Sequence, residues 1–416
     1  MPKRTHSPAP KPAARAQPPA DPRSRSLIKQ GSNNHQFGRS RYNQHKLSLI
    51  NPPTKYNQGF QKLPQPIGPS PYRLDLKDVI DPATYEAIVS GKYLVFHTAG
   101  DTGGVRDPHP QEYVAYAMEA DFYTNPADPS LNPAFFYLLG DCVYFNGQAS
   151  QYYPQFYEPY EHYLAPIFAV PGNHDGDPVA GDTSLSAFVR NYCAPQPGMH
   201  SPDAGDSTRT AMNQPNVYWT LVTPFAWLIG LYTNVPEGGE IHPNQLAWLA
   251  GELKGAGAEG VAIIVTMHHP IYSADEVHSG SQVMHDALAQ AVSKSGVMPD
   301  LVLAGHVHDY QRYTRTVGGK ESVYIVAGAG GYHNLHRIGE VNGEKIVTPV
   351  TLTETGDTVT FEKYVDDQFG FLRIELSNSQ LVGKYYTVGK YPAPQSAGVV
   401  VDTFTLDWQA DRKLQG

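Results

Sequence analysis

Eight short apolar runs recur between residues 93 and 327 and constrain the possible folds more than any other feature of the chain. Each has the length of a strand and is rich in β-branched or aromatic residues. They are YLVF (93–96), AFFYLL (134–139), IFAV (167–170), VYWTLV (217–222), WLIGL (227–231), VAIIVT (261–266), LVLA (301–304) and VYIVA (323–327). These runs predict buried strands.

Helical patterns separate several of the runs. In the stretch 243–253, Leu246, Leu249 and Leu253 share one face. The stretches 184–192 and 281–294 show a similar pattern, and each begins at a serine of the kind that caps helices. Strands alternating with helices predict an α/β body with buried sheets. After about residue 345 the pattern predicts strands alone, which we expect to complete a sheet rather than to form a separate domain.

Residues 1–70 differ in composition from the rest of the chain. They hold twelve of the 36 prolines and twelve Lys or Arg against one acid, whereas the remainder has 19 basic and 39 acidic residues. We therefore divide the chain into a basic, Pro-rich arm over 1–70, disordered over about its first 30 residues, and a body over 71–416. A solvated or self-docking arm is the simpler interpretation, and binding to nucleic acid or membrane lipid is the alternative.

The composition says little about the compartment. The two cysteines are too few for a disulfide scaffold, although one bond between them stays open. No stretch is long and apolar enough to span a bilayer, and the basic N-terminus lacks the apolar region of an ordinary secretory signal. The cytoplasm is therefore the default expectation, and the oligomeric state stays open.

Polar side chains follow five of the apolar runs. Because the carboxyl ends of strands form the binding sites of α/β sheets, we expect these side chains to gather. They are Asp101, Asp141, Asn173, His174, His268, His269, His306 and His308. Carboxylates, imidazoles and an amide suit borderline divalent or trivalent metals, and the thiolates of a structural zinc site are missing. Each motif alone is compatible with an ordinary turn, but their coincidence after five strands predicts a metal site.

The ordered motifs GD, GDxxY, GNHD, HHP and GHVH resemble those of the calcineurin-like metallophosphoesterase superfamily over roughly residues 90–330. The resemblance implies a four-layer αββα sandwich of two mixed β-sheets flanked by helices, with 71–416 as the metallophosphoesterase domain. It also implies two metal ions bridged by Asp141. The first ion would be bound by Asp101 and His308, and the second by Asn173, His268 and His306. His174 would face the phosphate with Asp175 orienting it, and His269 would lie outside the ligand shell.

One position departs from the usual superfamily pattern. Gly103 stands where most members have a histidine for the first metal, and Tyr144 follows the bridging Asp141 by three residues. This combination resembles the purple acid phosphatase branch, which implies Fe(III) bound to tyrosinate and Fe(II), Zn or Mn as the second metal. A phenol with a pKa near 10 needs a strongly polarising cation to ionise at neutral pH. The alternative is that Tyr144 is a packing aromatic beside Phe145.

The resemblance implies hydrolysis of phosphate monoesters by a hydroxide held on the metals, with His174 stabilising charge on the phosphate oxygens. His278, ten residues after His268, is a candidate proton donor and substrate contact, together with His174 and His269; its alternative is an ordinary loop histidine. A phosphodiesterase or nucleotidase of the same superfamily is the alternative function. A non-enzymatic metal-binding scaffold with a polyanion-binding tail is a further one. The motifs leave the physiological substrate open.

Overall fold

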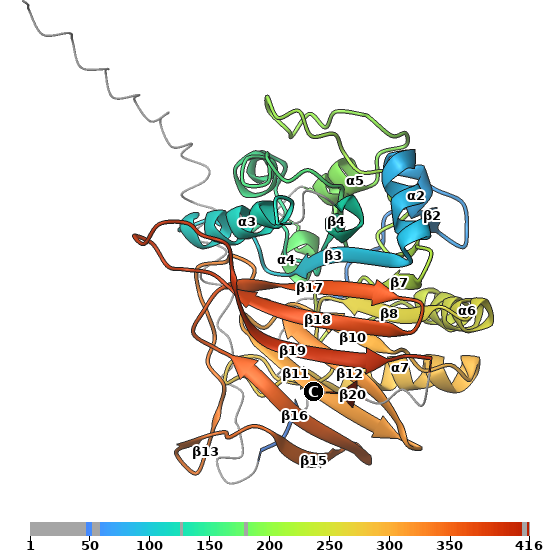
Figure 1. The fold of residues 1–416 in the computed structure, drawn as a ribbon, viewed down its shortest axis with the longest axis vertical. Coiled ribbons are helices and arrows are strands. Elements are labelled where there is room, and N and C mark those ends of the chain that lie inside the picture. The colour runs from blue at the N-terminus through green and yellow to red at the C-terminus, as the bar shows by residue number, and fades with distance from the viewer. Residues whose placement is uncertain (1–46, 52–58, 125–127, 179–181, 410–413, 416) are drawn as a thin grey trace, which may run out of the picture. The chain divides into compact units, whose positions relative to one another are not determined.

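Two large β-sheets pack face to face in the computed structural model, which describes residues 47–51, 59–124, 128–178, 182–409 and 414–415 (Figure 1). The seven-stranded sheet has the order β20-β19-β18-β17-β3-β4-β5. Its strands are β3 (Tyr93–Ala99), β4 (Pro133–Leu138), β5 (Ile167–Ala169), β17 (Gly370–Ser377), β18 (Gln380–Thr387), β19 (Val399–Asp407) and β20 (Leu414–Gln415). Strands β3, β4 and β5 are mutually parallel, so their carboxyl ends lie at one edge.

The nine-stranded sheet has the order β15-β16-β11-β12-β10-β8-β7-β6-β2. Its strands are β2 (Arg73–Asp75), β6 (Trp219–Val222), β7 (Ala226–Gly230), β8 (Ala262–Met267), β10 (Leu301–Ala304), β11 (Tyr310–Val317), β12 (Lys320–Ala327), β15 (Val350–Glu354) and β16 (Asp357–Val365). Strands β7, β8, β10 and β12 run parallel to one another. All eight apolar runs lie at least largely within these strands, as predicted.

The main core lies between the two sheets. Phe96 and Phe135 stack within the seven-stranded sheet at a centroid distance of 4.8 Å. Tyr137 reaches across to the other sheet, where its ring stacks on Trp219 and its hydroxyl accepts a hydrogen bond from Thr266 at 3.1 Å. Removing these large side chains from water is the main stabilising contribution, and the hydroxyl contact satisfies a buried polar group.

Helices pack against both sheets (Figure 1). Against the seven-stranded sheet pack α3 (His109–Asp121), α5 (Ser186–Tyr192) and the π-helical turn η4 (Tyr153–Tyr157), and against the nine-stranded sheet pack α6 (Pro243–Glu259) and α7 (Gln282–Ser295). The other elements are α2 (Pro82–Gly91), α4 (Asn173–Gly176), η1 (Leu76–Asp78), η2 (Pro129–Leu131), η3 (Ala149–Gln151), β1 (Ile50–Asn51), β9 (Gly280–Ser281), β13 (Glu340–Val341) and β14 (Glu344–Lys345). The predicted αββα sandwich is confirmed.

The predicted helix starts are correct for two helices and wrong for one. Helix α6 has Pro243 in its first turn, and α7 is capped by Ser281, whose hydroxyl accepts a hydrogen bond from the Met284 amide. Helix α5 begins after Leu185, which has a φ of 62° and makes no side-chain cap. Ser184 does not cap it because its hydroxyl donates to the Gly176 carbonyl at 2.6 Å. The hydrogen bond from Ser184 to the Gly176 carbonyl therefore takes the place of the predicted helix cap.

The strands after residue 345 complete both sheets rather than one. Strands β15 and β16 extend the nine-stranded sheet, whereas β17, β18, β19 and β20 belong to the seven-stranded sheet. The prediction that they form no separate domain agrees with this arrangement. None of the helices within the described ranges has the length and apolar character needed to cross a bilayer. Both cysteines, Cys142 and Cys193, are buried and free.

Part of the predicted arm packs against the body. Leu47 and Leu49 are buried, and the Leu49 amide donates to a Glu354 carboxylate oxygen at 2.9 Å. Strand β1 pairs in parallel with β9, which places Ile50 opposite Gly280. The arm boundary at residue 70 stays a prediction. The predicted disorder and the polyanion contact fall mainly on residues 1–46, which lie outside the described residues.

We expect Asp121→Asn to destabilise the seven-stranded sheet. Asp121 lies 3.0 Å from His97 Nε2 and accepts a hydrogen bond from Arg373 Nε at 2.9 Å. Burial opposes its ionisation, but the contacts with His97 and Arg373 outweigh burial and lower its pKa below the ordinary 3.8. The substitution should lower the free energy of unfolding by about 2 kcal/mol at neutral pH.

The same contact predicts a pH dependence. Because the folded-state pKa is lowered, the stabilisation is fully present above about pH 4 and is lost as the pH falls through the folded-state value. Denaturant unfolding of wild type and Asp121→Asn at several pH values should show the difference shrink only in acid. Asp367→Asn, an exposed carboxylate, is the control. A pH-independent difference between wild type and Asp121→Asn would contradict this assignment.

Candidate metal centre

The predicted ligands gather where the carboxyl ends of strands from both sheets meet. Asp101 follows β3 and Asp141 follows β4, while His306 follows β10 in the other sheet. These three residues have φ values of 57°, 50° and 70°, in the left-handed region that few non-glycine residues adopt. Such conformations persist where the surrounding structure holds them, and they cluster at functional sites.

One group of side chains surrounds the Asp101 carboxylate. The Tyr144 hydroxyl donates to Asp101 Oδ1 at 3.1 Å and lies 3.3 Å from His308 Nε2. His308 Nε2 is in turn 3.5 Å from Asp101 Oδ1. Three potential ligand atoms from β3, β4 and β10 therefore converge on one point.

A second group surrounds the Asn173 side chain. Its Oδ1 lies 2.9 Å from His268 Nε2 and 3.1 Å from His306 Nδ1. Asp141 connects the two groups because its Oδ2 is 3.4 Å from His268 Nε2. The ligand atoms of Asp101, Asp141 and His268 all lie within 4.8 Å of one another. The predicted bridging residue thus lies between the two groups.

Backbone carbonyls orient two of the imidazoles in these groups. Nδ1 of His268 donates to the Leu139 carbonyl at 2.8 Å, and Nδ1 of His308 donates to the Asn334 carbonyl at 2.8 Å. Each bond directs the ring's Nε2 toward the carboxylates. A carbonyl that fixes one ring nitrogen while the other faces the site is typical of metal-binding histidines.

Tyr144 occupies the space next to Gly103. A Cβ at residue 103 would lie 2.9 Å from the Tyr144 ring and 2.4 Å from Gln155 Oε1. Gln155 also holds the Tyr144 backbone, accepting from its amide at 2.9 Å and donating to its carbonyl at 2.7 Å. The Tyr332 ring stacks on that of Tyr144 at a centroid distance of 4.0 Å. The glycine and the tyrosine are therefore sterically linked, so no side chain fits at residue 103 while Tyr144 keeps this position.

Burial and mutual charge shift the pKa values of the site. Burial raises the pKa of Asp101 to about 6, with His268 opposing the shift. Burial also opposes ionisation of Asp141, but His268 and His174 outweigh it, so the pKa of this carboxyl is lowered. Burial would lower the pKa of His268, but the Asp141 charge raises it to about 9. The site therefore holds buried negative charge that attracts cations.

His174 lies beside the centre, and its neighbour Asp175 acts differently from the prediction. His174 Nδ1 donates to the Phe145 carbonyl at 2.7 Å, and its Nε2 is 3.9 Å from Asp141 Oδ2. We expected Asp175 to orient this ring, but the Phe145 carbonyl makes that contact. The Asp175 carboxylate accepts from the backbone amides of Cys142, Val143 and Gly172 at 2.9–3.1 Å. Asp175 therefore shapes the loop after β4.

The other two predicted histidines also lie at the centre. His269 is buried, with Nδ1 2.7 Å from the Thr233 hydroxyl and its ring 4.4 Å from that of His306. Burial lowers its pKa, so its imidazole is neutral. The His278 ring lies 4.2 Å from that of His306, so this loop histidine borders the second group.

Sequence reasoning missed three residues of the site. Gln155 holds Tyr144, Tyr332 stacks on it, and Glu237 lies 3.0 Å from His278. Tyr332 falls in the glycine-rich stretch AGAGGYHNLH, which is a visible signal for a tight turn near a site. Gln155 lies in a helical turn and Glu237 in the loop after β7, and neither belongs to a recognisable motif, so no local pattern marks them.

Comparison with known proteins agrees with this geometry. The family model of calcineurin-like phosphoesterases matches residues 99–310, which span every predicted ligand. This chain belongs to the calcineurin-like phosphoesterase family. The resemblance expected from its motifs is confirmed, and the family implies metal ions, for which the side chains described above are candidate ligands.

Several curated relatives of this phosphoesterase chain are purple acid phosphatases. Probable purple acid phosphatase 20 of Arabidopsis thaliana is 28% identical over 176 residues, which cover 40% of this chain and 38% of that protein. Purple acid phosphatase 18 of the same organism is 32% identical over 113 residues, which cover 26% of this chain and 24% of that protein. The matched stretches thus span less than two fifths of these relatives.

Solved structures share the fold. Purple acid phosphatase PPD1 from yellow lupin (Lupinus luteus) seeds has a TM-score of 0.50 at 17% identity, covering 76% of this chain and 54% of that one. GAP50, the anchor in the inner membrane complex of Plasmodium, has a TM-score of 0.50 at 18% identity, covering 76% of this chain and 89% of that one. At these identities the likeness concerns the fold.

We expect Gly103→Ala to displace Tyr144 or Gln155, because the new methyl group would overlap both. The variant should bind the first metal at least tenfold more weakly, a change that metal titration of the purified protein measures. Gly251→Ala is the matched control, since a Cβ at that helical position meets nothing within 4 Å. Unchanged metal affinity in Gly103→Ala would contradict the steric link between residues 103 and 144.

Proposed function

We propose that this chain is a phosphatase of the purple acid phosphatase type, which hydrolyses phosphate monoesters at a centre of two metal ions. The observation that carries the proposal is the convergence of seven ligands into two adjacent groups that Asp141 connects. The first ion would be held by Asp101, Tyr144 and His308, the second by Asn173, His268 and His306, and Asp141 would contact both. The donor set suits two cations, because carboxylate, imidazole and amide atoms face one another within a buried space.

The identity of the metals follows from Tyr144. Burial and the neighbouring Asp101 carboxylate raise the pKa of its phenol well above the ordinary value. A strongly polarising trivalent cation would therefore be needed to hold it as phenolate. We propose Fe(III) at the group containing Tyr144 and Fe(II), Zn or Mn at the other.

The bound cations would supply positive charge at the phosphate oxygens and lower the pKa of water. His174 supports this role from the protein side, since the Phe145 carbonyl fixes its Nδ1 and its Nε2 faces the Asp141 carboxylate. We assign His174 to hydrogen bonding with a phosphate oxygen, where charge develops during in-line displacement. His278 would protonate the leaving oxygen. His269 would support the His306 ring from behind rather than contact the phosphate directly.

A visible spectrum tests the tyrosinate. Iron-loaded protein should absorb broadly in the visible range through charge transfer from Tyr144, and Tyr144→Phe should lose that band. Tyr152→Phe is the control, because Tyr152 is equally buried and its hydroxyl makes no hydrogen bond within the described residues. A band that survives in Tyr144→Phe would exclude this ligand. A colourless protein that is fully active with Zn or Mn would favour the alternative function, a phosphodiesterase or nucleotidase of the same superfamily.

Hydrolysis assays test the reaction class. The wild type should cleave an aryl phosphate at least tenfold faster than a bis-aryl phosphate, and Asp141→Ala should lose about 10³-fold or more of either activity because both metals share this carboxylate. Asp367→Asn, an exposed position, should keep full activity. A preference for the bis-aryl phosphate would indicate a phosphodiesterase. Full activity in Asp141→Ala would make the site assignment wrong.

A further inference from the structure

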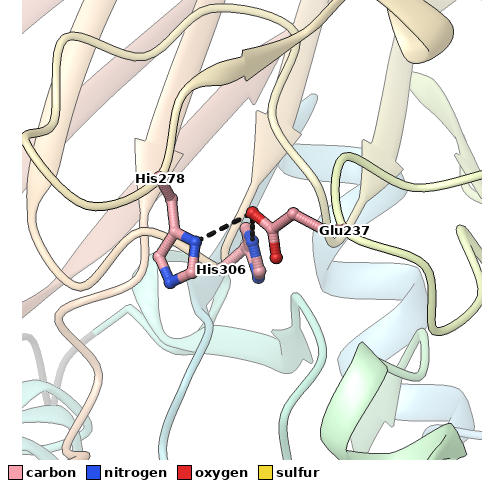
Figure 2. A group of neighbouring side chains, drawn as sticks. All are labelled: Glu237, His278 and His306. Carbon is pink, nitrogen blue, oxygen red and sulfur yellow. Dashed lines mark hydrogen bonds and ion pairs between the residues drawn. The ribbon is translucent and has the colours of Figure 1, made fainter. Parts of the chain in front are cut away.

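The loop between β7 and α6 brings a carboxylate to the edge of the centre. Glu237 points at two imidazoles, those of His278 and His306 (Figure 2). The Glu237 side chain is 22% exposed, and the two histidines are buried. No motif of the sequence contains Glu237, and the ligand assignment above does not use it. The cluster therefore needs its own explanation.

His278 is held at both its backbone and its ring. Its amide donates to Asp275 Oδ2 at 2.7 Å, and its carbonyl accepts from the Ser273 hydroxyl at 2.8 Å. These contacts set the position of the Cα atom but leave the rotation of the side chain undetermined. At the ring, Nδ1 donates to Glu237 Oε1 at 3.0 Å, and the ring also packs against that of His336 at a centroid distance of 5.3 Å. Glu237 therefore supplies the hydrogen bond that directs the Nδ1 edge of the imidazole ring.

The same carboxylate oxygen also faces a proposed metal ligand. Glu237 Oε1 lies 3.5 Å from His306 Nε2, and the opposite nitrogen of that ring, Nδ1, is 3.1 Å from Asn173 Oδ1. One oxygen thus lies between the imidazole of the proposed proton donor and that of a ligand to the second metal. The centroids of the two rings lie 4.2 Å apart beside this shared oxygen.

We propose that Glu237 is a positioning residue that holds His278 beside the second metal, where His278 can reach the leaving oxygen of the substrate. The inference rests on the proposed function. The 3.0 Å distance from Oε1 to His278 Nδ1 is that of a hydrogen bond, and the metal count given below separates this contact from a further cation site at Glu237, His278 and His306. A hydrogen bond to a carboxylate is strong enough to select one ring orientation.

A double-mutant cycle tests whether Glu237 acts through His278. We would measure kcat and KM of wild type, Glu237→Ala, His278→Ala and the double variant on two substrates. Glycerol phosphate has a poor leaving group that needs a proton, and nitrophenyl phosphate has a good one. Each single variant should lower kcat on glycerol phosphate by about 10²-fold, with a much smaller loss on nitrophenyl phosphate.

In the double variant, removing Glu237 should cost less than about twofold beyond His278→Ala, because the positioned ring is already gone. Glu237→Gln keeps an acceptor oxygen at the same reach, so it should retain more activity on glycerol phosphate than Glu237→Ala. It also serves as the second variant if Glu237→Ala unfolds. Glu240→Gln removes a charge from an exposed position of the same loop and should behave as wild type.

The possible outcomes separate the two proposals. The positioning role would be overturned if the kcat losses of the two single variants multiplied in the double variant, or if each loss were the same on both substrates. Either result would leave the phosphatase assignment intact. A metal content of three ions per wild-type chain that falls to two in Glu237→Ala would overturn the positioning role, and would indicate that Glu237 binds a metal ion instead. A folded, metal-loaded wild type that cleaves neither substrate would instead refute the proposed function itself.

Discussion

The rest of the centre depends on the hydrogen bonds that the buried carboxylate of Asp101 accepts. It accepts a hydrogen bond from the His306 amide at 2.7 Å and another from the Tyr144 hydroxyl at 3.1 Å, while its own amide donates to the Gly140 carbonyl. These partners follow strands β10 and β4, so one side chain joins loops from both sheets. Because burying a charge is costly unless it is paired, the fold must supply partners or a cation at this point. Asp141 is also buried and lies close by, so a second carboxylate needs a partner or a cation at the same place.

The site meets the requirement in layers. Inside, imidazoles and the Tyr144 phenol face the two carboxylates. Around them, the carbonyls of Leu139, Asn334 and Phe145 each fix one ring nitrogen of a histidine, so the other nitrogen is directed inward. Carboxylates support the same arrangement from farther out, with Asp175 holding the backbone after β4. This division between contact and support explains how each ring is held in one orientation.

Motif reasoning could single out the proposed ligands because each lies one to six residues beyond a strand that its own apolar pattern reveals. The alternation of strands and helices predicted an α/β body, whereas the αββα sandwich was an expectation from the family resemblance. The prediction failed where a residue's partner is distant in sequence. Ser184 was expected to cap a helix but bonds the Gly176 carbonyl, and Asp175 was expected to orient His174 but holds backbone amides instead. Local propensity cannot anticipate a competing contact that exists only after the chain has folded.

The sequence by itself determined which residue types follow each strand, including Gly103 and Tyr144, and therefore which ligand chemistry could be proposed, since these are properties of residue types at fixed spacing. Only the tertiary structure decided why Gly103 is required, because the atoms that exclude a side chain there belong to Tyr144 and Gln155. It also decided that Glu237 meets His278 across 41 residues of chain. Spacing governs what lies at the end of one strand, whereas contacts between loops depend on how the two sheets pack.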